Sequence, residues 1–132
     1  MIQAIGHIAL RVRDLDRSVQ FYTGVLGGEH IFDGTEDGTV NLVYVKLAPN
    51  TYVELFRSEP EAKKGSTEIG FMHLCLTVED IYETEKMILR SGWPASPVRK
   101  GKYGNYQIWL KDPDENEIEL MQILPDFLMG NA

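Results

Sequence analysis

Cysteine is almost absent from this 132-residue sequence, with Cys75 as its single representative. One cysteine cannot close a disulfide within the chain and cannot build a metal site from several thiolates. Positive charge is also scarce, because 13 Lys and Arg stand against 20 Asp and Glu, a net charge of −7. This balance argues against nucleic acid or an anionic membrane surface as a general partner. A small anionic substrate held by one or two local cations remains compatible with it.

Long apolar runs and targeting segments are missing as well. No stretch approaches the roughly 18 consecutive apolar residues of a transmembrane helix, and the first residues lack the basic start and apolar core of a signal peptide. We therefore expect a cytoplasmic protein without a membrane partner. With 43% hydrophobic and 25% charged residues, the composition is that of an ordinary folded chain. The length predicts one domain, residues 1–132.

The sequence repeats itself, and the repeat organises the prediction of its fold. Gly6–Asp14 aligns with Met72–Asp80 at an offset of 66, with His, alternating aliphatic residues, Val and Asp in register. Tyr52–Phe56 aligns with Glu117–Met121 at an offset of 65. The chain therefore divides into two similar halves of about 60 residues each, and either half is too small to close a cavity alone.

Each half shows the same expected order of one strand, one helix and three further strands. Hydrophobic alternation predicts strands over Ala4–Val12, Glu29–Phe32, Val40–Ala48 and Thr51–Phe56 in the first half, and over Phe71–Val78, Ala95–Val98, Tyr106–Lys111 and Glu117–Gln122 in the second. We thus expect an α+β protein of two βαβββ modules. Their predicted ranges are 1–57 and 71–124, joined by a linker over 58–70.

The helices have recognisable start and stop signals. Asp14 and Asp80 can accept hydrogen bonds from the first helical N–H groups, so each is an expected N-cap. Glycine tolerates the left-handed backbone that ends many helices, which predicts ends at Gly27 and Gly92. In the first helix, helical spacing predicts one buried face lined by Leu15, Val19, Tyr22 and Leu26.

Each half carries one His near its start and one Glu near its end, His7 with Glu54 and His73 with Glu119. Because side chains alternate along a strand, all four lie on the less aliphatic face, which is free to line a cavity. A single His or Glu on a strand is usually not a metal ligand. The recurrence of a His and a Glu at nearly equal spacing in both halves favours a role as ligands. Two neutral imidazoles and two carboxylates neutralise a divalent ion and suit Zn, Ni, Co, Fe or Mn. These four side chains are the predicted metal ligands.

The motifs around these residues resemble those of the vicinal oxygen chelate superfamily, with glyoxalase I as the nearest type. They are Gly6-His7-Ile8, Arg13-Asp14-Leu15, Met72-His73-Leu74, Asp112-Pro113-Asp114 and Ile118-Glu119-Leu120. The resemblance implies paired βαβββ modules that form a curled eight-stranded mixed-sheet cavity around a metal. It matches all four predicted ligands residue by residue, and small bacterial members imply a homodimer.

The complete His/Glu/His/Glu set implies a metal-dependent lyase or isomerase of the glyoxalase I type. Its substrate would be a thiohemiacetal or a similar vicinal-oxygen compound, converted through a metal-stabilised enediolate. The resemblance implies that Glu119 and Glu54 are the catalytic carboxylates and that Arg11 binds the substrate. Ser58 stands where glyoxalase I carries an Asn that helps to hold glutathione, so we expect another thiol adduct.

Other interpretations remain open at this point. The superfamily also contains extradiol-type dioxygenases, epimerases and non-catalytic drug- or metabolite-binding modules. The basic cluster Arg99, Lys100 and Lys102 predicts either a clamp for an anionic substrate group or a solvated hairpin loop. Cys75 shares a strand face with His73, and we expect it to be a small buried thiol.

Overall fold

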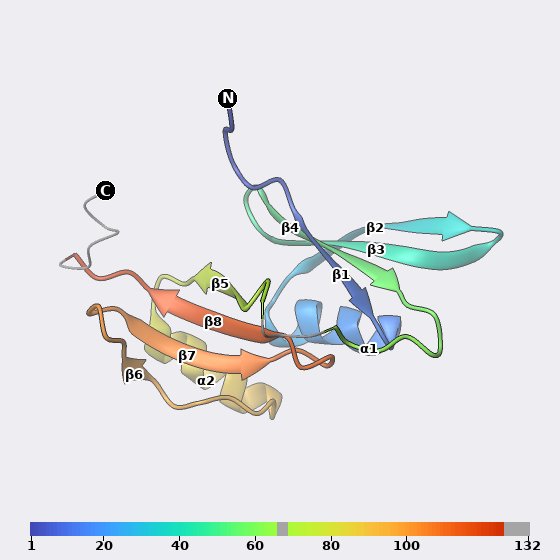
Figure 1. Ribbon diagram of the computed structural model, residues 1–132. Coiled ribbons are helices and arrows are strands. Elements are labelled where there is room, and N and C mark those ends of the chain that lie inside the picture. Colours follow the sequence, from blue (N-terminus) through green and yellow to red (C-terminus); the bar gives the residue numbers. More distant parts are fainter. Residues whose placement is uncertain (66–68, 126–132) are drawn as a thin grey trace. The chain divides into compact units, whose positions relative to one another are not determined.

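The computed structural model describes residues 1–65 and 69–125 (Figure 1). The chain forms two compact units, Met1–Gly65 and Ser66–Ala132, which we name unit 1 and unit 2. Part of the expected linker, residues 66–68, lies outside the described residues. None of the helices in the described ranges is long and apolar enough to cross a membrane.

Unit 1 is a mixed four-stranded sheet with a helical segment on one face (Figure 1). Its strands are β1 (Ile8–Val12), β2 (Glu29–Glu36), β3 (Thr39–Ala48) and β4 (Thr51–Arg57), in the order β1-β4-β3-β2. The helical segment consists of α1 (Leu15–Gln20) and the π-helical η1 (Phe21–Val25). Because β1 runs parallel to β4, the chain must cross over between them, and α1 lies in that crossover.

Unit 2 repeats this arrangement. Its elements are β5 (His73–Thr77), α2 (Ile81–Ser91), β6 (Arg99–Lys100), β7 (Tyr106–Lys111) and β8 (Glu117–Gln122). The strand order is β5-β8-β7-β6, with β5 parallel to β8 and the other pairs antiparallel. The predicted α+β class with two βαβββ modules is confirmed.

The helix ends follow the predicted signals. The Asp14 carboxylate accepts a hydrogen bond from the Arg17 amide, and the Asp80 carboxylate accepts from the amides of Tyr82 and Glu83. Gly92 ends α2 with φ of 73°. At the helix starts a short side-chain acceptor satisfies the first N–H groups, and at the helix end glycine permits the left-handed backbone. Both effects are local, so the sequence pattern suffices to predict the helix ends.

The buried face of the first helical segment agrees with the predicted one at Leu15 and Tyr22 but not at Val19 and Leu26. Its fully buried side chains are Leu15, Ser18, Phe21 and Tyr22. The π-helical η1 inserts an extra residue into the turn, with the Leu26 amide bonded to the carbonyl of Phe21. Val19 and Leu26 are only half-buried. Leu26 follows η1, where the regular 3.6-residue period no longer holds, and Val19 lines an open pocket.

The core of each unit lies between the helix and the aliphatic face of the sheet. On this face the buried strand residues of unit 1 are Val12, Val43, Val45, Val53 and Leu55, and those of unit 2 are Ile108, Leu110, Ile118 and Leu120. α1 contacts β3 and β4, and α2 contacts β7 and β8. The predicted packing of the aliphatic faces on the helices is confirmed, and it leaves the His- and Glu-bearing faces turned away from the helices.

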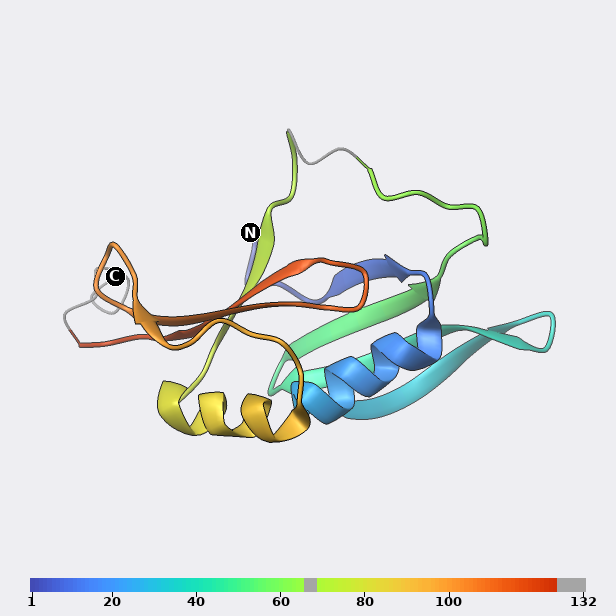
Figure 2. The same cartoon turned by 90° about the horizontal axis from the view of Figure 1, so that it is seen from below.

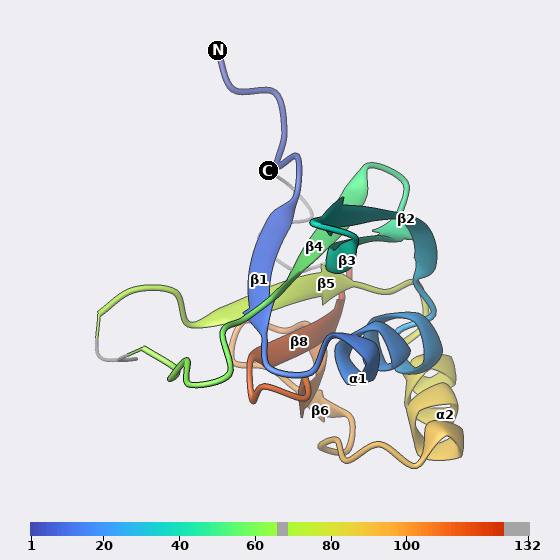
Figure 3. The ribbon, with the colours of Figure 1, turned by 90° about the vertical axis from the view of Figure 1, so that its right-hand side faces the viewer.

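Two of the predicted strands are shorter or less regular in the structure. β1 begins only at Ile8, and the N-terminal segment runs away from the sheet (Figure 3). The side chains of Met1, Ile2 and Ile5 are exposed. The expected strand Ala95–Val98 is reduced to an isolated bridge between Ala95 and Leu110. Pro94 and Pro97 lack the N–H groups that a strand ladder needs, so regular pairing resumes only at Arg99.

The hairpin of β2 and β3 is longer than the alternation predicted. β2 extends to Glu36, and the turn uses positive φ at both Asp37 and Gly38, the backbone that favours a tight hairpin. The hairpin projects past the N-terminal end of α1 (Figure 2).

Candidate metal centre

In unit 1 the predicted ligands His7 and Glu54 lie beside each other. His7 immediately precedes β1, and Glu54 lies in β4 opposite Ala9 of the parallel neighbour. The His7 Nε2 atom is 3.4 Å from Oε2 of Glu54. The His7 side chain is 44% exposed and that of Glu54 only 18%, so the carboxylate is the more enclosed partner.

Unit 2 reproduces this pair. His73 opens β5, and Glu119 lies in β8 opposite Cys75. The distance from His73 Nε2 to Glu119 Oε2 is 3.3 Å, and the two side chains are 32% and 9% exposed. The repeat in the sequence thus becomes a repeated pair of one imidazole and one carboxylate, each at matching places of two matching sheets.

The two pairs fit the donor set of a divalent transition metal. Ligand atoms about 2.1 Å from one ion at tetrahedral or octahedral angles are roughly 3.0–3.4 Å from each other. Both pairs have this separation between nitrogen and oxygen. In the described part of the chain no three His, Cys, Asp or Glu side chains gather at one point. Each unit by itself therefore provides two donors.

Aromatic side chains surround the pair in unit 1. Tyr44 lies opposite Glu54 on β3, and its hydroxyl oxygen is 3.3 Å from Nδ1 of His7. Phe32 stacks on Tyr44 with ring centroids 4.9 Å apart, and Tyr52 packs on Tyr44 from the neighbouring strand. A partner on Nδ1 orients the imidazole and leaves Nε2 directed toward Glu54.

In unit 2, Trp109 holds the place that Tyr44 has in unit 1, opposite the glutamate. Its ring meets the His73 imidazole edge to face, with centroids 4.9 Å apart. Gln107, on the same face of β7, donates a hydrogen bond of 2.8 Å from Nε2 to Oε1 of Glu119. Glu119 is thus held on one oxygen while the other faces His73.

Sequence reasoning missed Tyr44 and Gln107. Alternation with Val43 and Val45 already places Tyr44 on the less aliphatic face, and Ile108 does the same for Gln107. The missing information was the pairing register, because it alone brings a residue on one strand opposite the ligand on another.

Cys75 corrects one expectation, because it is exposed and not buried. Its thiol hydrogen-bonds to the Glu119 carboxylate. The loss of water around the sulfur, together with the negative charge of Glu119, raises the pKa of Cys75 to about 11. The side chain is therefore a neutral thiol near pH 7, which disfavours it as a metal ligand or nucleophile.

The predicted substrate-binding residues lie at different places. Arg11 is exposed on β1, with its side chain on the face of His7 and without an ion pair to any described residue. Arg99 pairs with Gln107, which places it on the face of Glu119. Lys100 pairs with Tyr106 and so points to the helix face, where Tyr106 meets Tyr82 of α2.

The basic cluster is consequently divided. Lys102 lies in the exposed turn, with its ammonium 5.5 Å from the centre of the Tyr103 ring. Only Arg99 of the three cations shares a sheet face with the predicted ligands, and this separation follows from the two-residue strand β6.

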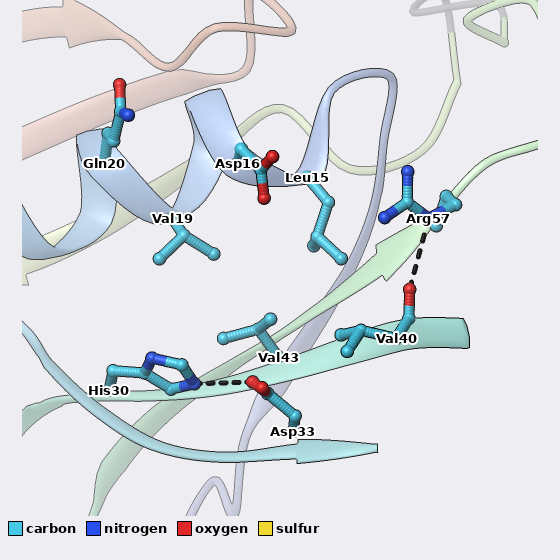
Figure 4. A pocket seen from close by; sticks show the side chains of 9 residues that line it. All are labelled: Leu15, Asp16, Val19, Gln20, His30, Asp33, Val40, Val43 and Arg57. Carbon is cyan, nitrogen blue, oxygen red and sulfur yellow. Dashed lines mark hydrogen bonds and ion pairs between the residues drawn. The ribbon is translucent and has the colours of Figure 1, made fainter. Parts of the chain in front are cut away.

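An open pocket of about 380 Å³ lies on the other face of the unit 1 sheet, between α1 and the β2–β3 hairpin (Figure 4). Its polar lining includes the ion pair of His30 and Asp33, with Nε2 and Oδ1 2.6 Å apart. Arg57 also lines it and donates to the Val40 carbonyl. None of the predicted metal ligands lines this pocket.

Comparison with known proteins gives the family. The sequence model of the glyoxalase/bleomycin resistance protein/dioxygenase superfamily matches residues 4–120. The chain belongs to this superfamily. A probable lactoylglutathione lyase of Synechocystis sp. is 34% identical over 122 residues, which cover 88% of this chain and 92% of that protein. The resemblance inferred from the motifs is therefore confirmed.

Other members of the superfamily show its breadth. An ethylmalonyl-CoA/methylmalonyl-CoA epimerase of Cereibacter sphaeroides is 31% identical, over 93% of this chain and 100% of its own length. A glyoxalase/bleomycin resistance/dioxygenase domain of Frankia sp. EAN1pec has the same fold, with a TM-score of 0.78 at 23% identity. That alignment covers 92% of this chain and 98% of the Frankia chain. Relatives named as lyases support an enzyme family. Because the superfamily includes several reactions, the reaction of this chain has to be inferred from its site.

Proposed function

We propose that this protein is a metal-dependent lyase of the glyoxalase I type, acting on a thiohemiacetal or a similar compound with two adjacent oxygens. The observation that supports it most is the repeated His–Glu pair, with nitrogen and oxygen 3.4 Å apart in one unit and 3.3 Å in the other. Lyase-named relatives at about one-third identity agree with this reading.

His7, Glu54, His73 and Glu119 would together hold one divalent ion, with Ni, Zn, Co, Fe and Mn as the candidates. When bound, the ion supplies Lewis-acid stabilisation of negative charge that develops on the two substrate oxygens. The two carboxylates balance its charge. The ion and its four ligands together would be neutral, so the negative charge that develops in the reaction would be carried by the substrate.

The chain's own residues would perform the proton transfer and the binding. The carboxylates of Glu119 and Glu54 are the groups that can take a proton from one carbon and return it to the neighbouring one. Both are largely shielded from water, which protects the transferred proton from exchange. Arg11 and Arg99, on the faces of the two pairs, would bind an anionic end of the substrate, with Lys102 nearby in the turn and Lys100 on the opposite face.

Since each unit provides two donors, a complete centre requires one unit of each kind. We propose a symmetric homodimer in which His7 and Glu54 of one subunit share an ion with His73 and Glu119 of the other. Two such centres would then form per dimer.

The test of this function combines metal analysis with a substrate screen. Purified protein should contain about one transition metal per chain, and reconstituted protein should convert methylglyoxal in the presence of a suitable thiol. A chelator should abolish turnover, and the added metal should restore it. Protein without metal and without turnover over the panel of thiols would contradict the proposal and favour a small-molecule binding module.

Epimerisation beside a thioester carbonyl is the second candidate, favoured by the 31% identity to the acyl-CoA epimerase. It uses the same proton abstraction by a carboxylate but returns the proton to the same carbon. Glu54 disfavours it, because the resemblance implies Gln at that position in methylmalonyl-CoA epimerases. Inversion of configuration at the α-carbon of an acyl-CoA, with solvent deuterium taken up at that carbon, would identify this activity.

A further inference from the structure

The two predicted glutamate ligands differ in how they are held. Oε1 of Glu119 accepts the 2.8 Å hydrogen bond from Gln107, while Oε2 lies 3.3 Å from His73. Glu54 has only its contact with His7 in the described part of unit 1. The carboxylate of unit 2 is thus fixed in rotation, and that of unit 1 is not.

The difference arises at two positions of the repeat. The Cys75 thiol hydrogen-bonds to Glu119, whereas its counterpart Ala9 has no polar side-chain group; the donor to Oε1 is Gln107. Gln107 lies opposite Met121 in the register of β7 with β8. The corresponding position in unit 1 is Leu42, opposite Phe56 in the register of β3 with β4. Leu42 offers no hydrogen-bond donor, so unit 1 has no counterpart of the amide at this place.

The Gln107 amide is itself held by the turn that follows β6. A Cβ atom on Gly101 would lie 2.9 Å from both Cδ and Nε2 of Gln107 and 2.8 Å from Oδ1 of Asn105. The turn is closed by a 2.7 Å bond from the Gly101 amide to the Asn105 carbonyl. On the other side, Trp109 Nε1 lies 3.4 Å from Oε1 of Gln107. The Gln107 amide therefore lies between the backbone of Gly101 and the indole of Trp109.

We propose that Gln107 is a positioning residue for Glu119, and that Gly101 is the glycine that keeps Gln107 in place. This inference rests on the proposed function, in which Glu119 is a metal ligand. The amide occupies Oε1, which directs Oε2 to the ion beside His73 and restrains the carboxylate before the ion binds. Outer-shell partners of this kind typically contribute about 10–100-fold to metal affinity.

The first test replaces Gln107 by Met, which has a similar volume but no donor. We expect Gln107→Met to weaken metal affinity about 10–100-fold in competition with a chromophoric chelator. The melting temperature of the metal-free protein should stay close to that of the wild type, which separates positioning from folding. The matched control is Leu42→Met at the corresponding position of unit 1, and its metal affinity should stay unchanged.

The second test leaves Gln107 intact. In Gly101→Ala the added methyl group meets the ends of flexible side chains, so the protein can fold by displacing the amide. We expect the metal affinity to fall in the same direction. Gly101→Ala combined with Gln107→Met should bind metal no more weakly than Gln107→Met alone, because both changes act on one hydrogen bond.

The outcomes distinguish this inference from the proposed function. Wild-type protein that binds a metal together with Gln107→Met of equal affinity would overturn the inference alone. Additive losses in the combined variant would overturn the role of Gly101. Wild-type protein without any bound metal would overturn both the inference and the proposed function.

Discussion

In each unit one imidazole and one carboxylate lie side by side at a pair of parallel strands. Parallel pairing places Ala9 beside Glu54 and Cys75 beside Glu119, so each histidine reaches its glutamate along a diagonal. A diagonal neighbour is within reach of a long side chain. The pair therefore needs both a long carboxylate and a histidine two residues before the directly opposed position.

The metal proposal predicts a strong effect of removing one donor. His73→Ala or Glu119→Ala should lose most of the bound metal and lower turnover by about 10²-fold or more, because an ion left with an incomplete and unneutralised shell binds weakly. Circular dichroism should remain close to that of the wild type, and metal content is measured by elemental analysis.

Glu117 provides the matched control for these variants. It lies on the same strand face two residues from Glu119, but its carboxylate is 3.5 Å from the ammonium of Lys111 and its side chain is 43% exposed. Glu117→Ala should keep its metal and its turnover. Full metal and full turnover in Glu119→Ala would show that the ligand assignment is wrong.

The serine at position 58 leads to a prediction about the thiol part of the substrate. Ser58 directly follows β4, and its amide donates to the Val12 carbonyl, which fixes the backbone there. A serine hydroxyl has a single O–H donor and cannot replace the two N–H donors and the separate carbonyl acceptor of a carboxamide. We expect kcat/KM for the glutathione adduct of methylglyoxal to lie below about 10⁴ M⁻¹s⁻¹ and a different thiol adduct to react faster. A higher value with glutathione, measured by initial rates, would contradict this.

Among the elements, η1 and the turn after it join α1 to β2. Gly28 packs so closely that a Cβ would lie 2.6 Å from the Tyr22 carbonyl oxygen and 2.7 Å from Cγ1 of Val45. One of these neighbours is backbone and the other a stiff β-branched side chain, so neither yields easily. The close approach fixes where the helix meets the sheet of unit 1.

This contact predicts the effect of a single methyl group. Gly28→Ala should lower the free energy of unfolding by about 1–3 kcal/mol, the usual range for overpacking. Gly24→Ala is the control, because a Cβ there has nothing within 4 Å and the position lies inside η1. Its effect should be small or stabilising by up to about 1 kcal/mol. Chemical denaturation measures both, and equal stabilities of the two variants would refute the packing argument.

At the scale of the whole molecule, a centre with four ligands would require both His–Glu pairs. Each unit supplies half of the four predicted ligands, and the two halves can come from one chain or from two. A mixture of inactive variants separates these arrangements, because the position of the lesions in each centre differs between them.

We predict that His7→Ala and Glu119→Ala, each inactive alone, regain activity when they are mixed and allowed to exchange subunits. In a cross-subunit dimer the mixed species has one centre with both lesions and one intact centre. Random exchange should therefore restore about one-quarter of the wild-type activity per chain. If all ligands come from one chain, every centre carries a lesion, and the mixture should stay inactive in the same initial-rate assay.

The sequence by itself determined those features that depend on near neighbours in the chain. The 65- and 66-residue offsets, the strand alternation and the caps at Asp14 and Asp80 sufficed to predict two βαβββ modules. They also sufficed to place each His and Glu on the face away from the helix, because periodicity and capping are local properties. The roles of these side chains as ligands remain predictions.

The tertiary structure alone decided what depends on register and close packing. Pairing across strands brings Gln107 to Glu119 and Tyr44 to His7, and it separates Arg99 from Lys100. No short-range pattern encodes which residues on two distant strands lie opposite each other, because the register depends on turns and packing along the entire sheet. The π-helical η1 was not predicted either, because the sequence pattern was interpreted with a regular period of 3.6 residues per turn.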